Sequence, residues 1–266
     1  MDYRKLNAIT RKDAYLIPRI NELLSRPAKA KFFTKFDIRA AFNRIQIDPD
    51  SEEYTTFRTR YSTYKCKVLP FGLCNGLATY QRYMNDVLVN YLDNFCIAYL
   101  DDILIYSEDE VTHTLHVKKV LERLRQAGLH VDIKKSEFHV NRTKYLGYVL
   151  TSQGLEVDPD KVSVLRDWKP PTTVTGVKSF LGFAGFYRQF VPEFSRVAKP
   201  IIMLQSPVNP FVWSPECQQA FDQVREALLA IPTLYHFHPE LDTRLETDAS
   251  DGVIAGVFSQ KQSDGS

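Results

Sequence analysis

Two adjacent carboxylates, Asp101 and Asp102, separate two apolar runs whose composition is typical of β-strands. The runs cover residues 95–100 (FCIAYL) and 103–106 (ILIY). This order predicts a buried hairpin whose turn consists of the two acids. Burying two carboxylates costs free energy unless cations compensate their charge. The pair is therefore either a solvated Asp-Asp turn, which is common in hairpins, or part of a cation site.

A third acid, Asp37, ends another strand-like segment, residues 31–37 (KFFTKFD). Adjacent strands lie about 4.8 Å apart, so carboxylates at neighbouring strand ends could bind the same ions. Enzymes that transfer phosphoryl groups with two metal ions hold those ions roughly 4 Å apart. If the strands are neighbours, the three acids predict a two-metal site.

The remaining pattern predicts an α+β chain with at least one appended domain. Strand-like segments cover residues 146–150 and 244–260, and an exposed hairpin covers 57–67 with its turn at Ser62-Thr63. Gly182 and Gly185 are expected to allow close packing of the helix that contains them. Apolar spacing and capping residues predict helices over 79–92, 117–128, 158–168 and around 177–184, and one that opens at Ser214-Pro215.

Charge is distributed unevenly, although the net charge is only +2. Residues 1–36 contain nine Lys or Arg against three Asp or Glu, and residues 236–266 contain two against six. A basic leading segment suits a nucleic-acid backbone, but it suits a solvated surface equally well. No apolar run reaches the length of about 18 residues that a membrane span needs, so no membrane partner is expected.

Cysteines and histidines give no metal-binding spacing. The four cysteines (Cys66, Cys74, Cys96 and Cys217) are scattered and are interpreted as reduced thiols of an intracellular protein. The pairs His113/His116 and His236/His238 have no third ligand at a suitable distance in the sequence. We therefore expect structural histidines. The N-terminal residues do not resemble a secretory signal.

Six short motifs follow one another over nearly the whole chain. They are residues 2–7 (DYRKLN), 36–42 (FDIRAAF), 69–73 (LPFGL), 99–102 (YLDD), 145–148 (YLGY) and 180–188 (FLGFAGFYR). A YxDD motif alone is a weak signal, but six motifs in register are specific. Together they resemble the reverse transcriptases of gypsy-type LTR retrotransposons. Residues 245–251 (LETDASD) are similar to the opening strand of that family's ribonuclease H domain.

The resemblance implies a right-hand polymerase fold. Fingers (in part) and palm would cover residues 1–150, a helical thumb 151–205, a connection 206–240 and a truncated ribonuclease H-like domain 241–266. The implied activity is RNA-directed DNA polymerisation within a retrotransposon polyprotein, a nucleotidyl transfer that uses two Mg²⁺ ions, with Mn²⁺ as an alternative. Implied partners are an RNA or DNA template, a primer and dNTPs, with a second copy or a longer Pol chain left open. The implied location is cytoplasmic, in element particles, with the nucleus as a second location.

The resemblance also implies residue roles. Asp37 and Asp101 would bind both metal ions together with the Ile38 carbonyl, and Asp102 would support the acidic cluster. Phe42 would be an aromatic steric gate against a ribose 2′-hydroxyl, with plain core packing as the alternative. The residues implied to contact nucleotide and template are Ala40, Ala41, Phe71 and Gly72, and those implied for the primer grip are Leu146, Gly147 and Tyr148. Asp248 would bind a metal ion of the nuclease. Further contacts to the template are implied for Arg58, Arg60, Tyr61, Tyr64 and Lys65.

Three departures from the family pattern keep other functions open. The chain starts inside the fingers, residues 75–78 (NGLA) replace an Asn-Ala-Pro or Asn-Ser-Pro run, and the nuclease is truncated and expected to be inactive. One alternative is a catalytically silent fragment that binds primer–template without extending it. The other is a subunit that another chain completes.

Overall fold

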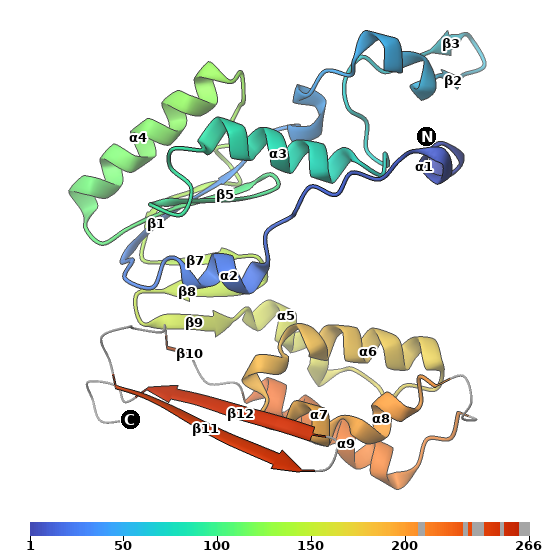
Figure 1. The fold of residues 1–266 in the computed structure, drawn as a ribbon, viewed down its shortest axis with the longest axis vertical. Helices are drawn as coiled ribbons and strands as arrows, with labels where there is room; N and C mark the ends of the chain where they lie inside the picture. Colours follow the sequence, from blue (N-terminus) through green and yellow to red (C-terminus); the bar gives the residue numbers. More distant parts are fainter. Residues whose placement is uncertain (207–210, 231–233, 236–241, 251–252, 261–266) are drawn as a thin grey trace.

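The computed structural model describes residues 1–206, 211–230, 234–235, 242–250 and 253–260 (Figure 1). Its centre is a four-stranded antiparallel sheet in the order β4-β5-β1-β6. The strands are β4 (Cys96–Tyr99), β5 (Asp102–Ser107), β1 (Phe32–Asp37) and β6 (Glu137–Val140). The predicted strand before Asp37 and the predicted pair around Asp101 and Asp102 are therefore confirmed as neighbours.

Alternation along the central strands divides the core into two clusters, as the period of two in a strand requires. Phe36, Ile103 and Ile105 pack on one face against α3 (Gly76–Leu88) and α4 (Glu110–Gln126). Phe33 on β1 and Leu104 on β5 lie in the other cluster, which continues into the C-terminal helices. Figure 1 shows α3 and α4 on one side of the sheet and the helical block on the other.

The ends of the two helices on the sheet were predicted with different success. The Asp109 side chain accepts a hydrogen bond from the Thr112 amide at 2.9 Å and caps α4, which stops before Gly128 as predicted. In contrast, α3 spans Gly76–Leu88, so it begins and ends earlier than the predicted 79–92. The prediction placed the start too late because Gly76 is a poor helix former, although here it is buried beside Phe42.

A second antiparallel sheet has the order β10-β9-β8-β7. Its strands are β7 (Arg142–Tyr145), β8 (Tyr148–Thr151), β9 (Gly154–Val157) and β10 (Leu234–Tyr235). The strand predicted over 146–150 starts only at Tyr148, because Leu146 and Gly147 form the turn between β7 and β8. This sheet lies between the central sheet and the helical block (Figure 1).

The helical block begins where proline follows a capping residue. Asp158 precedes Pro159 and Ser214 precedes Pro215, and each side chain accepts a hydrogen bond from a backbone amide of the first turn. The predicted helix 158–168 is a short α-helix followed by a 3₁₀ helix, Val164–Arg166. The helices are α5 (Pro159–Ser163), α6 (Val174–Phe186), α7 (Phe194–Val197), α8 (Lys199–Met203) and α9 (Pro215–Leu229).

Two glycines of α6 do not have the packing role that the sequence suggested. A Cβ atom added to Gly182 or Gly185 would meet nothing within 4 Å. The apolar face of α6 instead packs through Phe180, whose ring lies 4.6 Å from that of Phe221 on α9. Gly182 is exposed and Gly185 is half-buried, so neither brings another helix close to α6.

The remaining elements lie outside these two sheets and the helical block. They are α1 (Arg4–Ile9), α2 (Ile20–Ser25), the hairpin β2 (Phe57–Arg58) with β3 (Thr63–Tyr64), and the hairpin β11 (Thr243–Ser250) with β12 (Val253–Gln260). The turn predicted at Ser62-Thr63 is wrong by a small shift, because Thr63 pairs with Arg58. No helix among the described residues is both long and apolar enough to span a membrane. His236 and His238 lie outside the described residues.

Candidate active site

The three predicted carboxylates lie at one end of the central sheet. Asp37 at the end of β1 pairs in register with Asp102 at the start of β5. Asp102 also pairs with Tyr99 on β4, so the hairpin turn consists of Leu100 and Asp101 and not of the two acids. The predicted Asp101-Asp102 turn is thus wrong by one residue. The Ile38 amide donates to the Asp101 carbonyl at 3.2 Å and holds the turn against the end of β1.

The carboxylates at this end of the sheet repel one another. Burial raises the pKa of Asp102, the charges of Asp101 and Asp37 raise it further, and Lys35 opposes the rise. Asp37 has a cationic neighbour, Lys135, whose Nζ lies 3.8 Å from the Asp37 carboxylate. Lys135 is largely exposed, so this ion pair contributes little stability.

The donor chemistry of the cluster fits a hard divalent cation. Carboxylate and carbonyl oxygens are the ligands that Mg²⁺ prefers, and a cation would relieve the repulsion that raises the pKa of Asp102. Within the described ranges, no three His, Cys, Asp or Glu side chains already stand close enough together to hold a metal ion.

The predicted nucleotide contacts form an aromatic layer beside the acids. Ala40 has a left-handed backbone (φ 51°) and begins a 3₁₀ helix, Ala41–Arg44, which buries the Phe42 ring. That ring lies 4.9 Å from the ring of Phe71, which is 71% exposed. Gly72 follows with φ 101°, and its carbonyl accepts a hydrogen bond from the Asn7 side chain at 2.7 Å. Phe42 is thus packed in the core and also lies under an exposed aromatic ring.

Two buried residues of α3 that the sequence analysis did not single out also belong to this region. The Tyr80 ring lies 5.1 Å from that of Phe42, and its hydroxyl is the one buried side-chain polar atom without a hydrogen-bond partner in the described part of the chain. Burial raises the pKa of Tyr80, and the charges of Asp101 and Asp37 add to the rise. Its neighbour Gln81 accepts a hydrogen bond from the Leu100 amide at 2.8 Å. A signal existed for Gln81, because it lies on the apolar face three residues before Met84.

The residues predicted for the primer grip form a tight turn that the helical block holds. Leu146 and Gly147 both have positive φ, 50° and 85°. The Tyr187 hydroxyl donates to the Gly147 carbonyl at 3.0 Å, and the Tyr148 hydroxyl donates to the Phe186 carbonyl at 3.1 Å. Tyr148 is buried, so only the backbone and the Leu146 side chain remain accessible at this turn.

The predicted template contacts lie apart, on the β2–β3 hairpin and the residues around it. Their exposed side chains also contact one another or neighbouring acids: the Arg60 guanidinium lies 4.4 Å from the Tyr61 ring centre, and Lys65 forms an ion pair with Glu52 at 3.0 Å. The structure brings none of them to the carboxylates. Asp248 lies on β11, and its side chain falls outside the described part of the structure.

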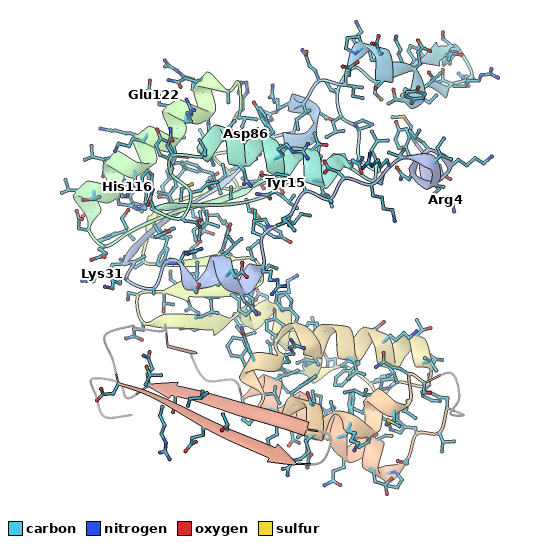
Figure 2. The ribbon with its side chains drawn as sticks, in the orientation of Figure 1. Arg4, Tyr15, Lys31, Asp86, His116 and Glu122 are labelled. Atoms are coloured by element: carbon cyan, nitrogen blue, oxygen red, sulfur yellow. The ribbon has the colours of Figure 1, made fainter. Side chains whose placement is uncertain are left out.

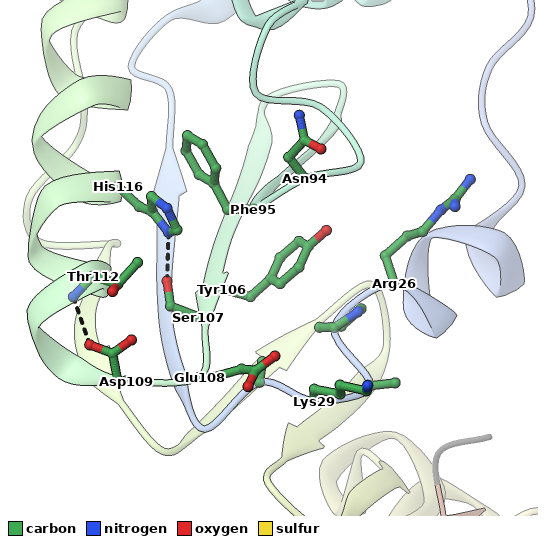
Figure 3. A pocket seen from close by; sticks show the side chains of 13 residues that line it. Arg26, Lys29, Asn94, Phe95, Tyr106, Ser107, Glu108, Asp109, Thr112 and His116 are labelled. Atoms are coloured by element: carbon green, nitrogen blue, oxygen red, sulfur yellow. Dashed lines mark hydrogen bonds between the residues drawn. The ribbon is translucent and has the colours of Figure 1, made fainter. Parts of the chain in front are cut away.

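A cavity of about 460 Å³ lies at the other end of β5 (Figure 3). Its wall includes Ser107, whose hydroxyl lies 2.8 Å from Nδ1 of His116, and the His116 ring stacks on Phe95 at 3.7 Å. Asp102 and Ser107 are the first and last residues of β5, so this cavity is separated from the carboxylates by the length of the strand. It belongs to the side of the sheet where α4 starts.

Comparison with known proteins shows the family of the chain. Residues 1–150 match the family model described as reverse transcriptase (RNA-dependent DNA polymerase). The chain belongs to the reverse transcriptase family. Residues 213–266 match a second model, an RNase H-like domain found in reverse transcriptase. The resemblance on which the sequence analysis relied is therefore confirmed.

Relatives of this reverse transcriptase include Pol polyproteins of transposons. It is 35% identical over 98% of its length to the retrovirus-related Pol polyprotein from transposon opus of Drosophila melanogaster, and 34% identical over 98% to that from transposon 297. It is 31% identical over 99% to the transposon Tf2-3 polyprotein of Schizosaccharomyces pombe. The chain spans only 27%, 25% and 20% of these three relatives.

Solved structures confirm the predicted α+β right-hand polymerase fold. A foamy viral protease-reverse transcriptase in complex with an RNA/DNA hybrid matches 98% of the chain, with a TM-score of 0.84 and 25% identity, over 36% of its own length. The same viral protein in a complex with double-stranded DNA matches 98% of the chain, with a TM-score of 0.87 and 25% identity, over 46% of its own length.

Proposed function

We propose that this chain is the core of an RNA-directed DNA polymerase that extends a primer along an RNA or DNA template, as part of a retrotransposon polyprotein. The observation that carries the proposal is the juxtaposition of Asp37 and Asp102 in register, with Asp101 in the adjoining turn. Membership of the reverse transcriptase family supports it. The proposed location is inside the cell, in cytoplasmic element particles and in the nucleus.

The proposed reaction is attack of a primer 3′-hydroxyl on the α-phosphate of a dNTP, with pyrophosphate as the leaving group. When bound, two Mg²⁺ ions, or Mn²⁺ in their place, would activate the hydroxyl and stabilise charge on the leaving oxygen. Asp37 and Asp101 would hold both ions with the Ile38 carbonyl, and Asp102 would increase the negative potential. The Lys135 ion pair with Asp37 would open as the ions enter.

Nucleotide selection is assigned to the aromatic layer. Phe71 is exposed and would lie under the base pair, with Gly72 allowing close approach of the backbone. Phe42 is held between Phe71 and Tyr80, so its ring would present a rigid edge to the sugar and exclude a ribose 2′-hydroxyl. Ala40 and Ala41 are small enough for the triphosphate to approach backbone amides.

The primer would be held between the palm and the helical block. We propose fingers and palm over residues 1–150, a thumb over 151–205, a connection over 206–240 and the nuclease start over 241–266, where Asp248 would bind a nuclease metal ion. The Leu146–Gly147 turn, braced through Tyr148, would position the primer 3′ end, and such positioning lowers the barrier by several kcal/mol. The open space around Gly182 and Gly185 of α6 would leave room for a nucleic acid to approach the thumb. Complexes of the foamy viral relative with nucleic acid support these partners.

The deciding test measures dNTP incorporation on an RNA template with a DNA primer in Mg²⁺. Asp101→Asn removes the charge while keeping the size of the side chain, and we expect a loss of about 10³-fold or more. Asp86→Asn on the exposed side of α3 is the matched control and should retain activity. Primer–template binding should persist in both variants.

Three outcomes separate the proposal from its alternatives. Incorporation that Asp101→Asn abolishes supports the polymerase. Binding of primer–template without incorporation by the parent chain would identify a silent fragment. Incorporation that appears only after a longer Pol chain is added would identify a subunit that another chain completes.

A further inference from the structure

A buried amide side chain holds the turn that carries Asp101. Gln81 on α3 is fully buried, and both ends of its amide are used. Its Oε1 accepts a hydrogen bond from the Leu100 amide at 2.8 Å, and its Nε2 donates to the Ala98 carbonyl at 3.0 Å. Gln81 thus bonds to the backbone on both sides of Tyr99, immediately before Asp101.

The turn needs such support because its first residue is strained. Leu100 has φ 54°, a left-handed conformation that is unfavourable for a residue with a side chain. Two-residue hairpin turns usually place glycine, asparagine or aspartate where φ is positive. Strain of this kind persists only where surrounding contacts overdetermine the backbone. The hydrogen bond from Leu100 to Gln81 is such a contact.

Gln81 is itself held by a chain of polar contacts that leaves the palm core. Its Nε2 also donates to Asn85 Oδ1 at 2.9 Å, and Asn85 Nδ2 donates to the Tyr15 hydroxyl at 2.7 Å. Tyr15 belongs to the segment before α2 and lies beside α3 (Figure 2). The Arg82 guanidinium is 4.8 Å from the centre of the Tyr15 ring and forms an ion pair with Asp13 at 2.7 Å.

We propose that Gln81 is a positioning residue for Asp101, and that Asn85 and Tyr15 extend this support to the segment before α2. The inference rests on the proposed polymerase function. A buried polar network whose members are all bonded fixes one arrangement of its backbone partners. The direction that Asp101 takes from the turn therefore depends on Gln81, although Gln81 contacts neither substrate nor metal.

The proposal predicts which kinetic constant changes. Without the hydrogen bond to Gln81, the Leu100 amide loses its partner and the turn can relax away from φ 54°. Asp101 would then be misplaced relative to Asp37, which lowers the rate of the chemical step. Phe42 and Phe71, which are assigned to the nucleotide, stay in place because their packing does not involve Gln81. We expect kcat to fall and the KM for dNTP to change little.

Three variants test the inference. Gln81→Met keeps the length of the side chain and removes every hydrogen bond, and kcat should fall about 10²-fold. Tyr15→Phe removes one half-buried hydroxyl at the far end of the chain of contacts, so it should fold normally and lower kcat about threefold. Gln218→Met is the matched control, because Gln218 on α9 also bonds at both ends, to Trp213 and Asp222, and should leave kcat unchanged.

A second measurement does not depend on activity. Hydrogen exchange of the Leu100 amide should accelerate at least tenfold in Gln81→Met, and to a smaller extent in Tyr15→Phe, while exchange in α9 stays unchanged. If the parent chain incorporates nothing, the polymerase proposal fails, but the exchange result still decides whether Gln81 holds the turn. Unchanged kcat and unchanged Leu100 protection in Gln81→Met would overturn the inference. So would an equal loss of kcat in Tyr15→Phe and Gln218→Met.

Discussion

Two tight turns of this molecule, Leu100–Asp101 and Leu146–Gly147, share an unusual feature and differ in what stabilises it. Each joins two antiparallel strands and opens with a leucine at positive φ, 54° and 50°. The first turn is bonded by Gln81 from α3, within the proposed palm. The second is bonded by Tyr187, which follows α6 of the proposed thumb. The turn proposed for catalysis therefore belongs to the palm alone, whereas the turn proposed to hold the primer is attached to the thumb.

The two turns also differ in their second residue. Asp101 has a side chain to present, and it is not among the residues with positive φ. Gly147 has φ 85°, as the second position of a type I′ turn requires, and it presents only backbone. A movement of the thumb would thus be transmitted to the primer grip through Gly147 while Asp101 stays fixed.

The largest effect is expected at the thumb contact. Gly147→Ala adds a Cβ that would lie 3.3 Å from the Phe186 ring at a φ that favours glycine, so we expect a loss of about 3 kcal/mol in unfolding free energy. Gly128→Ala is the control, because Gly128 has φ 68° but open space around it, and should cost about 1 kcal/mol. Chemical denaturation measures both. Equal losses would show that the contact with Phe186 is irrelevant.

A lower pH should reduce the stability of the proposed palm through a buried histidine that the proposed thumb lacks. Burial lowers the pKa of His113 to about 4, and the nearby His139 and His116 add to the shift. The fold therefore keeps His113 neutral, and its stability is complete above the unfolded pKa of about 6.5 and is lost as the pH falls toward 4. At pH 5 the loss from this group is about 2 kcal/mol relative to pH 7.5. No histidine occurs between residues 142 and 235, so the thumb contributes no such loss.

The His113 prediction is checked by urea denaturation at both pH values, with His113→Gln as the comparison. His113 bonds the hydroxyls of Thr34 on β1 and Ser107 on β5, at 2.8 and 2.9 Å, so it joins the two strands that carry Asp37 and Asp102. The variant should be less stable at pH 7.5 and should lose less stability on acidification. An identical pH dependence in both proteins would contradict the assignment.

A smaller loss is expected when the thumb bond to the primer-grip turn is removed. Tyr187→Phe deletes the hydroxyl that donates to Gly147, which should cost about 1 kcal/mol. Exchange of amides around Gly147 should accelerate, and that of Leu100 should not. The test is hydrogen exchange monitored at both turns in one sample. Faster exchange at Leu100 would show that the two turns are coupled and would contradict their separate stabilisation.

The sequence predicted the strands and the acids but missed the two turns for a common reason. Turn rules favour Asp, Asn and Gly, so Asp101 and Asp102 looked like turn residues, and Leu146 looked like part of a strand. The residues that bond these turns, Gln81 at Leu100 and Tyr187 at Gly147, are far away in the sequence, so no local pattern reveals a leucine at positive φ. The lack of packing around Gly182 and Gly185 is likewise a tertiary property. Asp37 was predictable because it ends an apolar strand.

The smallest effect should be a gain in stability, because the tyrosine hydroxyls near the two turns differ in whether they have a hydrogen-bond partner. Tyr148 and Tyr187 both donate hydrogen bonds, whereas the buried Tyr80 hydroxyl beside Gln81 has no partner. An unpaired buried hydroxyl costs free energy, so Tyr80→Phe should stabilise the protein by about 0.5–1 kcal/mol and raise the Tm by roughly 2 °C. The Phe42 contact with the ring should persist, which the retained discrimination between dNTP and rNTP would confirm. A lower Tm in Tyr80→Phe would contradict the prediction and would mean that the hydroxyl forms a hydrogen bond in solution.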